Sequence, residues 1–383
     1  MSWNWQAPDW PRFSWDAARL RAAENEFLVG AGMFAGSIRH LPDPDRELLI
    51  VEAIGSEAVT TSEIEGEVLD RASVQSSIRR RLGLATDRRR VRPAEDGVAE
   101  MMVDLYGSVA APLSDEILFG WHRMLLKARR DLAEVGCYRT GRDPMQIVSG
   151  PLHAQRVHFE APPASAVPRE MRRFLDWFHR CAPGGKEPLP ALTRAGLAHL
   201  YFESIHPFED GNGRLGRAIS EKAFAEGVGQ PTLTSLAATL LAHRKSYYAA
   251  LEAANQGIDA TQWLVWFAGV AIEAQRRTAA AVEFLIDKTK LLDRLRGRLN
   301  TRQEKALLRM LAEGPEGFRG GLSAANYMAI TGASTATATR DLADLVEQGA
   351  LVRDGERRYA RYRVAIPLRP VAPVRIAADG SLS

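Results

Sequence analysis

The chain has 383 residues, of which 46% are apolar and 25% charged, and its formal net charge is +3. That length can bury a full core in two or three domains, and so small a charge neither requires nor excludes a nucleic-acid partner. Two cysteines exclude a disulfide framework and cannot alone complete a zinc site. Because no secretory leader and no run of roughly 18 apolar residues occurs, we expect a cytoplasmic protein without a membrane partner.

Residues 1–95 are predicted to form a helical N-terminal region behind an aromatic-rich beginning. A helix is expected to start at Asp43, an N-cap residue that Pro44 follows in the first turn. It should run towards Glu65, where Gly66 can end it.

Residues 96–285 read mostly as helix. The exception is Gln146 to Glu160, where β-branched residues flank a Gly-Pro turn. That pattern predicts a β-hairpin inserted among helices.

The composition changes again over residues 286–365. Thr301 to Glu304 is a capping box that opens an apolar helix, and further helices are expected near 323–330 and 334–348. A strand pair follows, so the order of elements predicts a winged helix-turn-helix domain. Residues 366–383, rich in proline and small side chains, are expected to be a poorly ordered tail.

DNA binding by this domain stays an open alternative. Its expected wing carries arginines that could contact phosphates, at positions 353, 357, 358, 361 and 363. The expected recognition helix, however, is poor in long polar side chains. Winged helices also serve in dimerisation and docking, so the fold alone does not decide.

The residues that carry chemistry lie between His206 and Arg217. Apolar residues at helical spacing before His206 and after Gly213 place a short loop between two helices. The loop combines a histidine, acids, glycines, an asparagine and arginines, a density of reactive groups that packing does not explain.

This composition predicts phosphate chemistry. Gly211-Asn212-Gly213 opens a helix, where free N–H groups and the dipole favour an anion. Arg214 and Arg217 could grip phosphate oxygens. An aspartate in the loop suits a magnesium ion that also binds phosphates, and a histidine suits a general base.

Of two rival phosphate motifs, one is disfavoured and the other is excluded. Residues 211–216 match the dinucleotide pattern GxGxxG literally, but that motif needs a preceding strand, and here a helix precedes it. No GxxxxGK(S/T) occurs, which excludes a P-loop.

His206 to Arg217 fits HxFx(D/E)GN(G/K)RxxR, the motif of Fic-domain proteins, at every constrained position, and the chain resembles that family. The resemblance implies a mainly α fold, with a helical Fic core at 96–285. In such a core the hairpin would be a flap that aligns a target segment. The implied reaction is transfer of AMP from ATP to a Ser, Thr or Tyr hydroxyl of a target protein.

The resemblance also implies roles for single residues. His206 would be the base that deprotonates the target hydroxyl, and Phe208 would anchor the loop in the core. Asp210 would hold Mg²⁺ against the α- and β-phosphates. Tyr248 and Asn255 resemble adenine-pocket residues, although an aromatic and an asparagine on a helix often serve packing.

The helix start carries the remaining nucleotide contacts. Gly211, Asn212 and Gly213 would form the anion-binding turn, with Asn212 helping to orient the α-phosphate. Arg214 and Arg217 would bind the outer phosphates.

Thr61 to Gly66 resembles the Fic inhibitory motif (S/T)xxxE(G/N). By that resemblance Glu65 would pair with Arg217, the arginine that should grip the γ-phosphate. ATP would then bind in an unproductive pose. We therefore expect an autoinhibited enzyme.

Three alternatives stay open. The first is a DNA-binding regulator whose Fic core senses nucleotide. The second is a Fic enzyme with another donor of UMP, phosphocholine or phosphate; Gly213 favours AMP over phosphate, because the phosphotransferring branch tends to carry lysine there. The third is removal of AMP from the target, which the inhibitory glutamate supports in some relatives. Self-modification and a homodimer are also compatible with the sequence, and no motif identifies the target.

Overall fold

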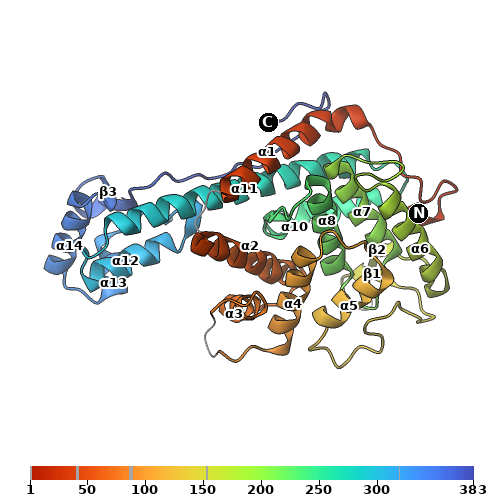
Figure 1. The fold of residues 1–383 in the computed structure, drawn as a ribbon, viewed down its shortest axis with the longest axis horizontal. Coiled ribbons are helices and arrows are strands. Elements are labelled where there is room, and N and C mark those ends of the chain that lie inside the picture. The colour runs from red at the N-terminus through yellow and green to blue at the C-terminus, as the bar shows by residue number, and fades with distance from the viewer. Residues whose placement is uncertain (1, 40–42, 86–88, 152–153, 319) are drawn as a thin grey trace. The chain divides into compact units, whose positions relative to one another are not determined.

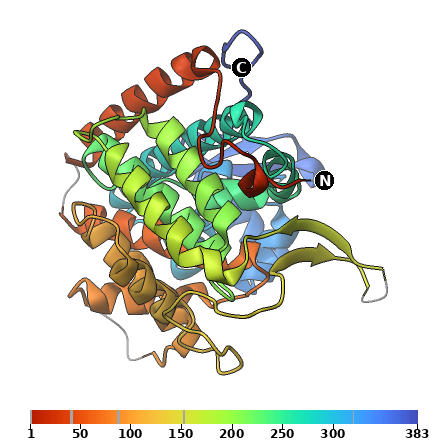
Figure 2. The ribbon, with the colours of Figure 1, turned by 90° about the vertical axis from the view of Figure 1, so that its right-hand side faces the viewer.

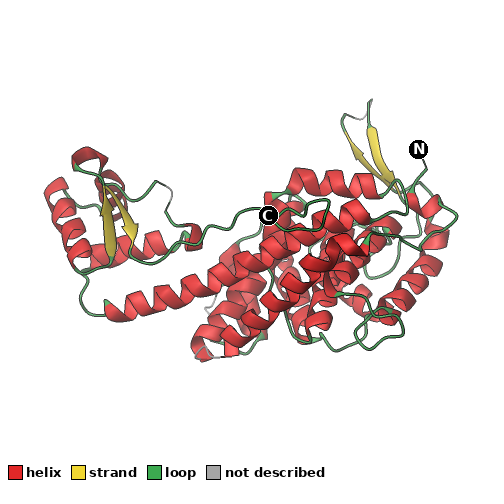
Figure 3. Cartoon of the chain, turned by 90° about the horizontal axis from the view of Figure 1, so that it is seen from above, coloured by secondary structure: helices red, strands yellow, loops and turns green. Residues whose placement is uncertain are grey.

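The computed structural model describes residues 2–39, 43–85, 89–151, 154–318 and 320–383. Two compact units emerge, Met1–Gln275 with Pro373–Ser383 and Arg276–Ala372, and each is considered by itself. In the described ranges the chain is mainly helical with two small antiparallel sheets, as predicted (Figure 3). None of the described helices has the length and apolar character that a membrane span needs.

The larger unit is built almost entirely from helices (Figure 1). In chain order they are α1 (Arg21–Arg39), α2 (Asp43–Ile64), α3 (Arg71–Arg81), α4 (Pro93–Gly107), α5 (Asp115–Leu125), α6 (Val167–Arg180), α7 (Ala191–Ile205), α8 (Asn212–Val228), α9 (Leu236–Ala242), α10 (Arg244–Ala254) and α11 (Thr261–Arg294). Short 3₁₀ turns lie at Asn4–Gln6, Ala17–Leu20 and Ala164–Ala166. The boundary between the two units falls inside α11.

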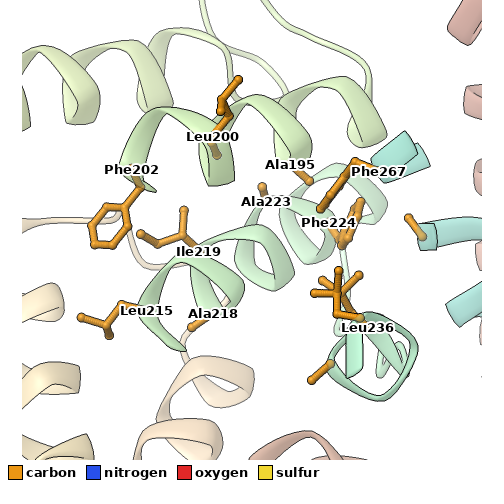
Figure 4. Packing of buried hydrophobic residues seen from close by; sticks show 14 of the residues in the cluster. Ala195, Leu200, Phe202, Leu215, Ala218, Ile219, Ala223, Phe224, Leu236 and Phe267 are labelled. Carbon is orange, nitrogen blue, oxygen red and sulfur yellow. The ribbon is translucent and has the colours of Figure 1, made fainter. Parts of the chain in front are cut away.

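The core of the larger unit is centred on α7 and α8. Every residue of α7 is buried, and α7 packs along α8. Figure 4 shows Leu200 and Phe202 of α7 beside Leu215 and Ile219 of α8. A helix enclosed on all sides has little freedom to move, so the short connection from α7 to α8 is held at both ends.

Helix α2 packs against α3, α4, α8 and α9. It ends at Ile64, and Gly66 turns the chain in the left-handed region with φ +86°. Glycine is suited to that conformation because it has no Cβ. The turn carries Glu65 towards the start of α8.

The predicted β-hairpin is present as β1 (Gln146–Ser149) and β2 (Arg156–Glu160). The strands pair antiparallel, with Gln146 opposite Glu160 and an irregularity between Ile147 and Val148. Figure 2 shows the hairpin extending from the helices of the larger unit. Residues 152–153, between the strands, lie outside the described residues.

The smaller unit has its own apolar core. Its elements after α11 are α12 (Thr301–Leu311), α13 (Ala324–Thr331), α14 (Thr335–Glu347), β3 (Leu351–Asp354) and β4 (Arg361–Val364), with 3₁₀ turns at Gly314–Glu316 and Arg357–Tyr359. This is the predicted order of helices and strands, and the winged-helix assignment itself stays a prediction. The side chain of Arg358, one of the expected wing arginines, lies outside the described set.

The capping box of α12 differs by one residue from the predicted one. Asn300, not Thr301, is the N-cap, and its side chain accepts hydrogen bonds from the N–H groups of Arg302 and Gln303. In return, the side-chain oxygen of Gln303 accepts a hydrogen bond from the Asn300 N–H at 2.9 Å. Asparagine is at least as good a cap as threonine, which explains the shift.

The last residues differ from the poorly ordered tail that their composition predicts. Pro373–Ser383 belongs to the larger unit, where Val374 is buried in the main core. Arg375 and Ser383 exchange backbone hydrogen bonds at 3.1 and 3.0 Å. Apolar burial therefore fixes this segment despite its content of small residues.

Candidate active site

The connection between α7 and α8 is held by hydrogen bonds and by a buried aromatic ring. His206 ends α7 in the left-handed conformation (φ 50°, ψ 60°), with its N–H bonded to the Phe202 carbonyl at 2.9 Å. Phe208 is fully buried, and its ring stacks on His122 with centroids 4.1 Å apart. Phe208 thus anchors the loop as predicted, and His206 is fixed where the helix stops.

Asn212 closes this loop from the first turn of α8. Its side-chain oxygen accepts from the Phe208 N–H, and its side-chain nitrogen donates to the Phe208 carbonyl, both at 2.9 Å. The amide is buried and committed to the backbone. Its expected contact with the α-phosphate stays a prediction, whereas its role in shaping the loop is plain from these bonds.

His206 lines a cavity of about 770 Å³. Other predicted site residues on its wall are Glu65, Gly213, Tyr248 and Asn255. Both hairpin strands reach the same cavity, for instance through Val148 and His158. One cavity is therefore lined by the residues expected to act as base, inhibitor, nucleotide contacts and flap.

Arg217 is paired with Glu65, as the sequence predicts. Its Nη2 donates to Glu65 Oε1 at 2.8 Å and to the Thr61 carbonyl at 2.9 Å, while its Nε donates to the Thr61 hydroxyl at 2.7 Å. Burial lowers the pKa of the Arg217 guanidinium, but Glu65 together with Tyr247 and Glu203 outweighs that effect, and the pKa is raised. Arg217 is therefore a buried, permanent cation.

Arg214 has an acidic partner that the sequence analysis missed. Its Nη1 donates to Glu67 Oε2 at 2.8 Å, and its Nη2 lies 3.6 Å from Asp210 Oδ1. Glu67 reaches it because the turn after α2 bonds the Glu67 N–H to the Ser62 carbonyl at 3.0 Å. The sequence signal that could have indicated this pair is the second acid, Glu67, directly after Gly66.

The Asp210 carboxylate already has hydrogen-bond and ion-pair partners. Its Oδ1 accepts from the Gly211 N–H at 2.6 Å, and its Oδ2 forms an ion pair with Arg129. Arg129 was also missed; it follows α5 and pairs with Asp131 at 2.6 Å. The Asp210 side chain is 35% exposed, so solvent reaches it.

These residues fit Mg²⁺ in one specific way. Within the described residues, no group of three or more His, Cys, Asp or Glu side chains could hold a metal ion by itself. Mg²⁺ commonly takes one or two carboxylates and fills its other positions with water and substrate phosphates. Asp210, beside the first turn of α8, suits an ion that arrives with a nucleotide.

Tyr248 on α10 and Asn255, directly after it, both line the cavity, although their side chains differ in exposure. Tyr248 is 41% exposed, and its hydroxyl donates to the Ile64 carbonyl at 3.4 Å. Asn255 is buried, and its side-chain oxygen accepts from the Ser204 hydroxyl at 3.2 Å and from Asn4 at 3.4 Å. Asn255 ties the N-terminus to the site, so its adenine contact stays a prediction.

A buried acid behind His206 was missed as well. Glu203 Oε2 lies 3.6 Å from His206 Nδ1, one turn earlier on α7. Burial raises the pKa of the Glu203 carboxyl, but His206, His199 and Arg217 together lower it below its ordinary value. Spacing of three residues on one helix was the signal that could have found it.

Part of the chain matches a known protein family. Residues 112–223 match the Fic/DOC family, and residues 3–84 match a domain of unknown function, DUF4172. Over 99 residues the chain is 29% identical to a probable protein adenylyltransferase of Aquifex aeolicus (strain VF5). That stretch is 26% of this chain and 27% of the relative, so the chain spans about a quarter of this curated relative's length.

Solved structures show the same fold. A Fic family protein from Desulfovibrio desulfuricans G20 matches with a TM-score of 0.52 at 22% identity, over 92% of this chain and 98% of that one. A Fic domain containing signaling protein from Bacteroides thetaiotaomicron VPI-5482 matches with a TM-score of 0.50 at 18% identity, over 69% and 98%. Identity this low establishes likeness of fold alone.

Proposed function

We propose that this chain, which contains a Fic/DOC domain over residues 112–223, transfers AMP from ATP to a hydroxyl side chain of a target protein. The observation that carries the proposal is the position of His206. It is fixed at the end of α7, on the wall of a cavity that also holds Gly213 of the first turn of α8. This position supports the proposal because a histidine suits a general base and the N-terminus of a helix suits an anion.

In the proposed reaction the hydroxyl oxygen of the target attacks the α-phosphorus of ATP. The bond from that phosphorus to the oxygen bridging to the β-phosphate breaks, and pyrophosphate leaves with the electron pair. His206 accepts the hydroxyl proton. Such transfers depend mainly on positioning and charge stabilisation, and a positioned base adds about 10²–10⁴-fold.

The first turn of α8 would bind the phosphates. Its N–H groups have no partners inside the helix, and Arg214 and Arg217 add positive charge there. Mg²⁺ at Asp210 would neutralise phosphate charge when bound. Tyr248 would contact the adenine at the far side of the cavity.

The hairpin would present the target. Ile147, Val148 and Val157 on its strands are each about two-fifths exposed. A two-stranded sheet leaves backbone groups unpaired at its edges, which suits addition of a target strand beside the cavity. Transfer to the chain itself is compatible with the same chemistry.

We further propose that Glu65 inhibits the transfer. A Cβ at position 213 would overlap Glu65 Oε1, so Gly213 is what lets this carboxylate sit against the first turn of α8. The carboxylate there stands in for a phosphate, and it also occupies Arg217 at 2.8 Å. ATP would have to displace it to bring its γ-phosphate to Arg217.

The test uses ATP labelled at the α-phosphate, Mg²⁺ and a cell lysate, with parallel reactions lacking lysate. The proteins compared are wild type, Glu65→Gly, Glu65→Gly/His206→Ala, and Glu63→Gly as matched control. Glu63 is exposed in the last turn of α2, two residues before Glu65, so its change places a glycine beside the same turn without freeing Arg217. We expect strong protein labelling in Glu65→Gly and weak labelling in wild type and Glu63→Gly. The double variant should give no label.

Absence of label in Glu65→Gly, with ATP still bound, would refute AMP transfer. Repeating the assay with labelled UTP would then separate a different donor from an inactive nucleotide sensor. Loss of label from a previously modified target on adding wild type would instead support AMP removal.

A second candidate function concerns the smaller unit. If it is a winged helix, the exposed Arg353 and Arg357 could contact DNA phosphates. Arg363 is less available because it lies 3.5 Å from Asp354. Binding to duplex DNA that weakens steeply with added salt would support a DNA-binding regulator, and absence of binding at low salt would remove it.

A further inference from the structure

A buried polar row runs along the last turns of α7 into His206. His199 and Glu203 are four residues apart and His206 follows three later, so the three side chains lie along one face. His199 Nε2 shares a hydrogen bond of 2.7 Å with the Tyr247 hydroxyl on α10. His199, Glu203 and Tyr247 are all buried, whereas His206 reaches the cavity.

The row is incompletely bonded where it meets His206. Among the described residues, neither His206 Nδ1 nor Glu203 Oε1 has a hydrogen-bond partner, although both atoms are buried. Glu203 Oε2 lies 3.6 Å from that Nδ1. Buried polar groups are costly to leave unpaired, and hydrogen bonds at reactive sites often shorten only when substrate binds.

Helix α8 is shaped to leave room for this acid. A Cβ at Gly216 would lie 2.6 Å from Glu203 Oε1 and 3.2 Å from the His199 ring. Any side chain at position 216 would therefore push Glu203 out of line with His206. The charged and titratable groups around Glu203 include His199, His206 and Arg217, with Tyr247 on α10.

We propose that Glu203 is a positioning residue for His206. Its carboxylate keeps a proton on Nδ1 and orients the ring, which leaves the Nε2 lone pair for the target hydroxyl. When Nε2 takes the hydroxyl proton, the Nδ1 proton stays in place and Glu203 stabilises the imidazolium. The acid of a nucleophile–base–acid triad has the same role: it orients the base and stabilises its protonated form without taking the proton.

The inference rests on the proposed AMP transfer for its kinetic consequence, but its structural part can be measured without nucleotide. A purely structural carboxylate would help α7 pack and would leave the ring tautomer unchanged. A glutamine at 203 can donate to Nδ1, which would drive the ring proton to Nε2. The tautomer therefore separates the two roles.

The experiment uses the full chain in the Glu65→Gly background, with Glu203→Gln, Glu203→Asp and Glu170→Gln. Glu170 is a buried carboxylate on α6 that bonds Trp10 and Arg173, so it controls for loss of a buried charge elsewhere. Nitrogen-15 NMR reads the His206 tautomer without nucleotide, with His206→Ala to identify the signals. Steady-state AMP transfer gives kcat and KM.

We expect the parent and Glu170→Gln to carry the neutral-ring proton on Nδ1 and Glu203→Gln to carry it on Nε2. In Glu203→Gln, kcat should fall about 10²-fold with KM for ATP within about twofold, and Glu203→Asp should recover part of the loss. If Glu203→Gln does not fold, Gly216→Ala displaces the same carboxylate and should shift the tautomer likewise.

An unchanged tautomer in the folded variant would overturn the proposal, as would a loss confined to KM. A parent that transfers no AMP would refute the proposed function, while the NMR result would still decide the role of Glu203.

Discussion

Glu65 Oε1 accepts a hydrogen bond from Arg217 Nη2 at 2.8 Å, and this pair joins the turn after α2 to the first turns of α8. The partners are unequally buried, since the Arg217 side chain is 4% exposed and that of Glu65 is 31% exposed. Losing the pair would therefore cost Arg217 more free energy than Glu65, because water can solvate the Glu65 carboxylate but not the buried guanidinium. An anion that replaces Glu65 should stabilise the fold at Arg217.

Glu65→Gly should lower stability and make stability depend on nucleotide. Removing one partner of a fully buried pair costs about 3–5 kcal/mol, and the exposure of Glu65 reduces the expected loss to about 1–2 kcal/mol. Thermal unfolding should show a lower Tm for the variant than for Glu63→Gly, and ATP should raise the variant's Tm more than the wild type's. Equal ATP-induced shifts in both proteins would contradict a role for Glu65 in blocking the phosphates.

Glu67→Ala should free Arg214 in the way that Glu65→Gly frees Arg217. The Arg214–Glu67 contact of 2.8 Å spans the same two segments, and Glu67 is partly exposed. We expect ATP affinity to rise by about two- to fivefold, in keeping with a pair worth about 0.5–1 kcal/mol. Calorimetric titration of both single variants and the double variant would measure the coupling between the two pairs. An affinity for ATP equal to that of wild type would show that Glu67 does not compete with phosphate.

Arg129→Ala should lower the Mg²⁺ concentration needed for AMP transfer. The guanidinium of Arg129 pairs with Asp210, the expected magnesium ligand, and has Asp131 as a second partner. An exposed pair of this kind is worth about 0.2–1 kcal/mol, which corresponds to a shift of at most about fivefold in the half-maximal Mg²⁺ concentration. Rates measured against Mg²⁺ in the Glu65→Gly background would test this. Arg130→Ala is the matched control because Arg130 is an exposed neighbour, and a similar shift there would point to a general charge effect.

Stability should fall as the pH rises towards neutrality because of two buried acids, Glu57 and Glu221. Burial raises the pKa of Glu221 on α8 to about 7, and burial with the nearby Glu221 charge raises the pKa of Glu57 on α2. An acid with a raised pKa in the folded state stabilises the fold below its ordinary pKa of 4.5. That stability is lost as the pH rises through about 7, amounting to about 3 kcal/mol for Glu221.

Glu221→Gln should remove most of this dependence. Thr232 donates to one Glu221 oxygen and Thr234 to the other, so a glutamine can accept from one hydroxyl and donate its NH2 to the oxygen of the other. Urea unfolding at pH 5 and pH 8 should show a smaller difference in the free energy of unfolding for the variant than for wild type. An identical difference in both proteins would mean that Glu221 does not titrate in this range.

Features that depend on neighbouring residues were predictable from the sequence. Gly66 ends α2, β-branched residues around a Gly-Pro turn give the hairpin, and the loop from His206 to Gly211 lies between two helices as its flanking periodicity predicts. Pairing of Glu65 with Arg217 followed from resemblance to a known motif. Where prediction was off by one residue, at the cap of α12, two good capping residues stood side by side.

What the sequence determined by itself is therefore which residues can do chemistry and on which local elements they lie, because backbone preference and side-chain periodicity act over a few residues. Tertiary structure decided which partners those residues have: Glu67 for Arg214, Arg129 for Asp210, and Asn4 with Ser204 for Asn255. These pairs join segments far apart along the chain, and they form because packing around α7 and α8 brings the segments after α2, α5 and α10 to the two ends of the loop between those helices. An unpaired buried charge or amide costs free energy, so such groups are usually paired in the folded protein. Their partners lie far away in the sequence, and no local pattern identifies them.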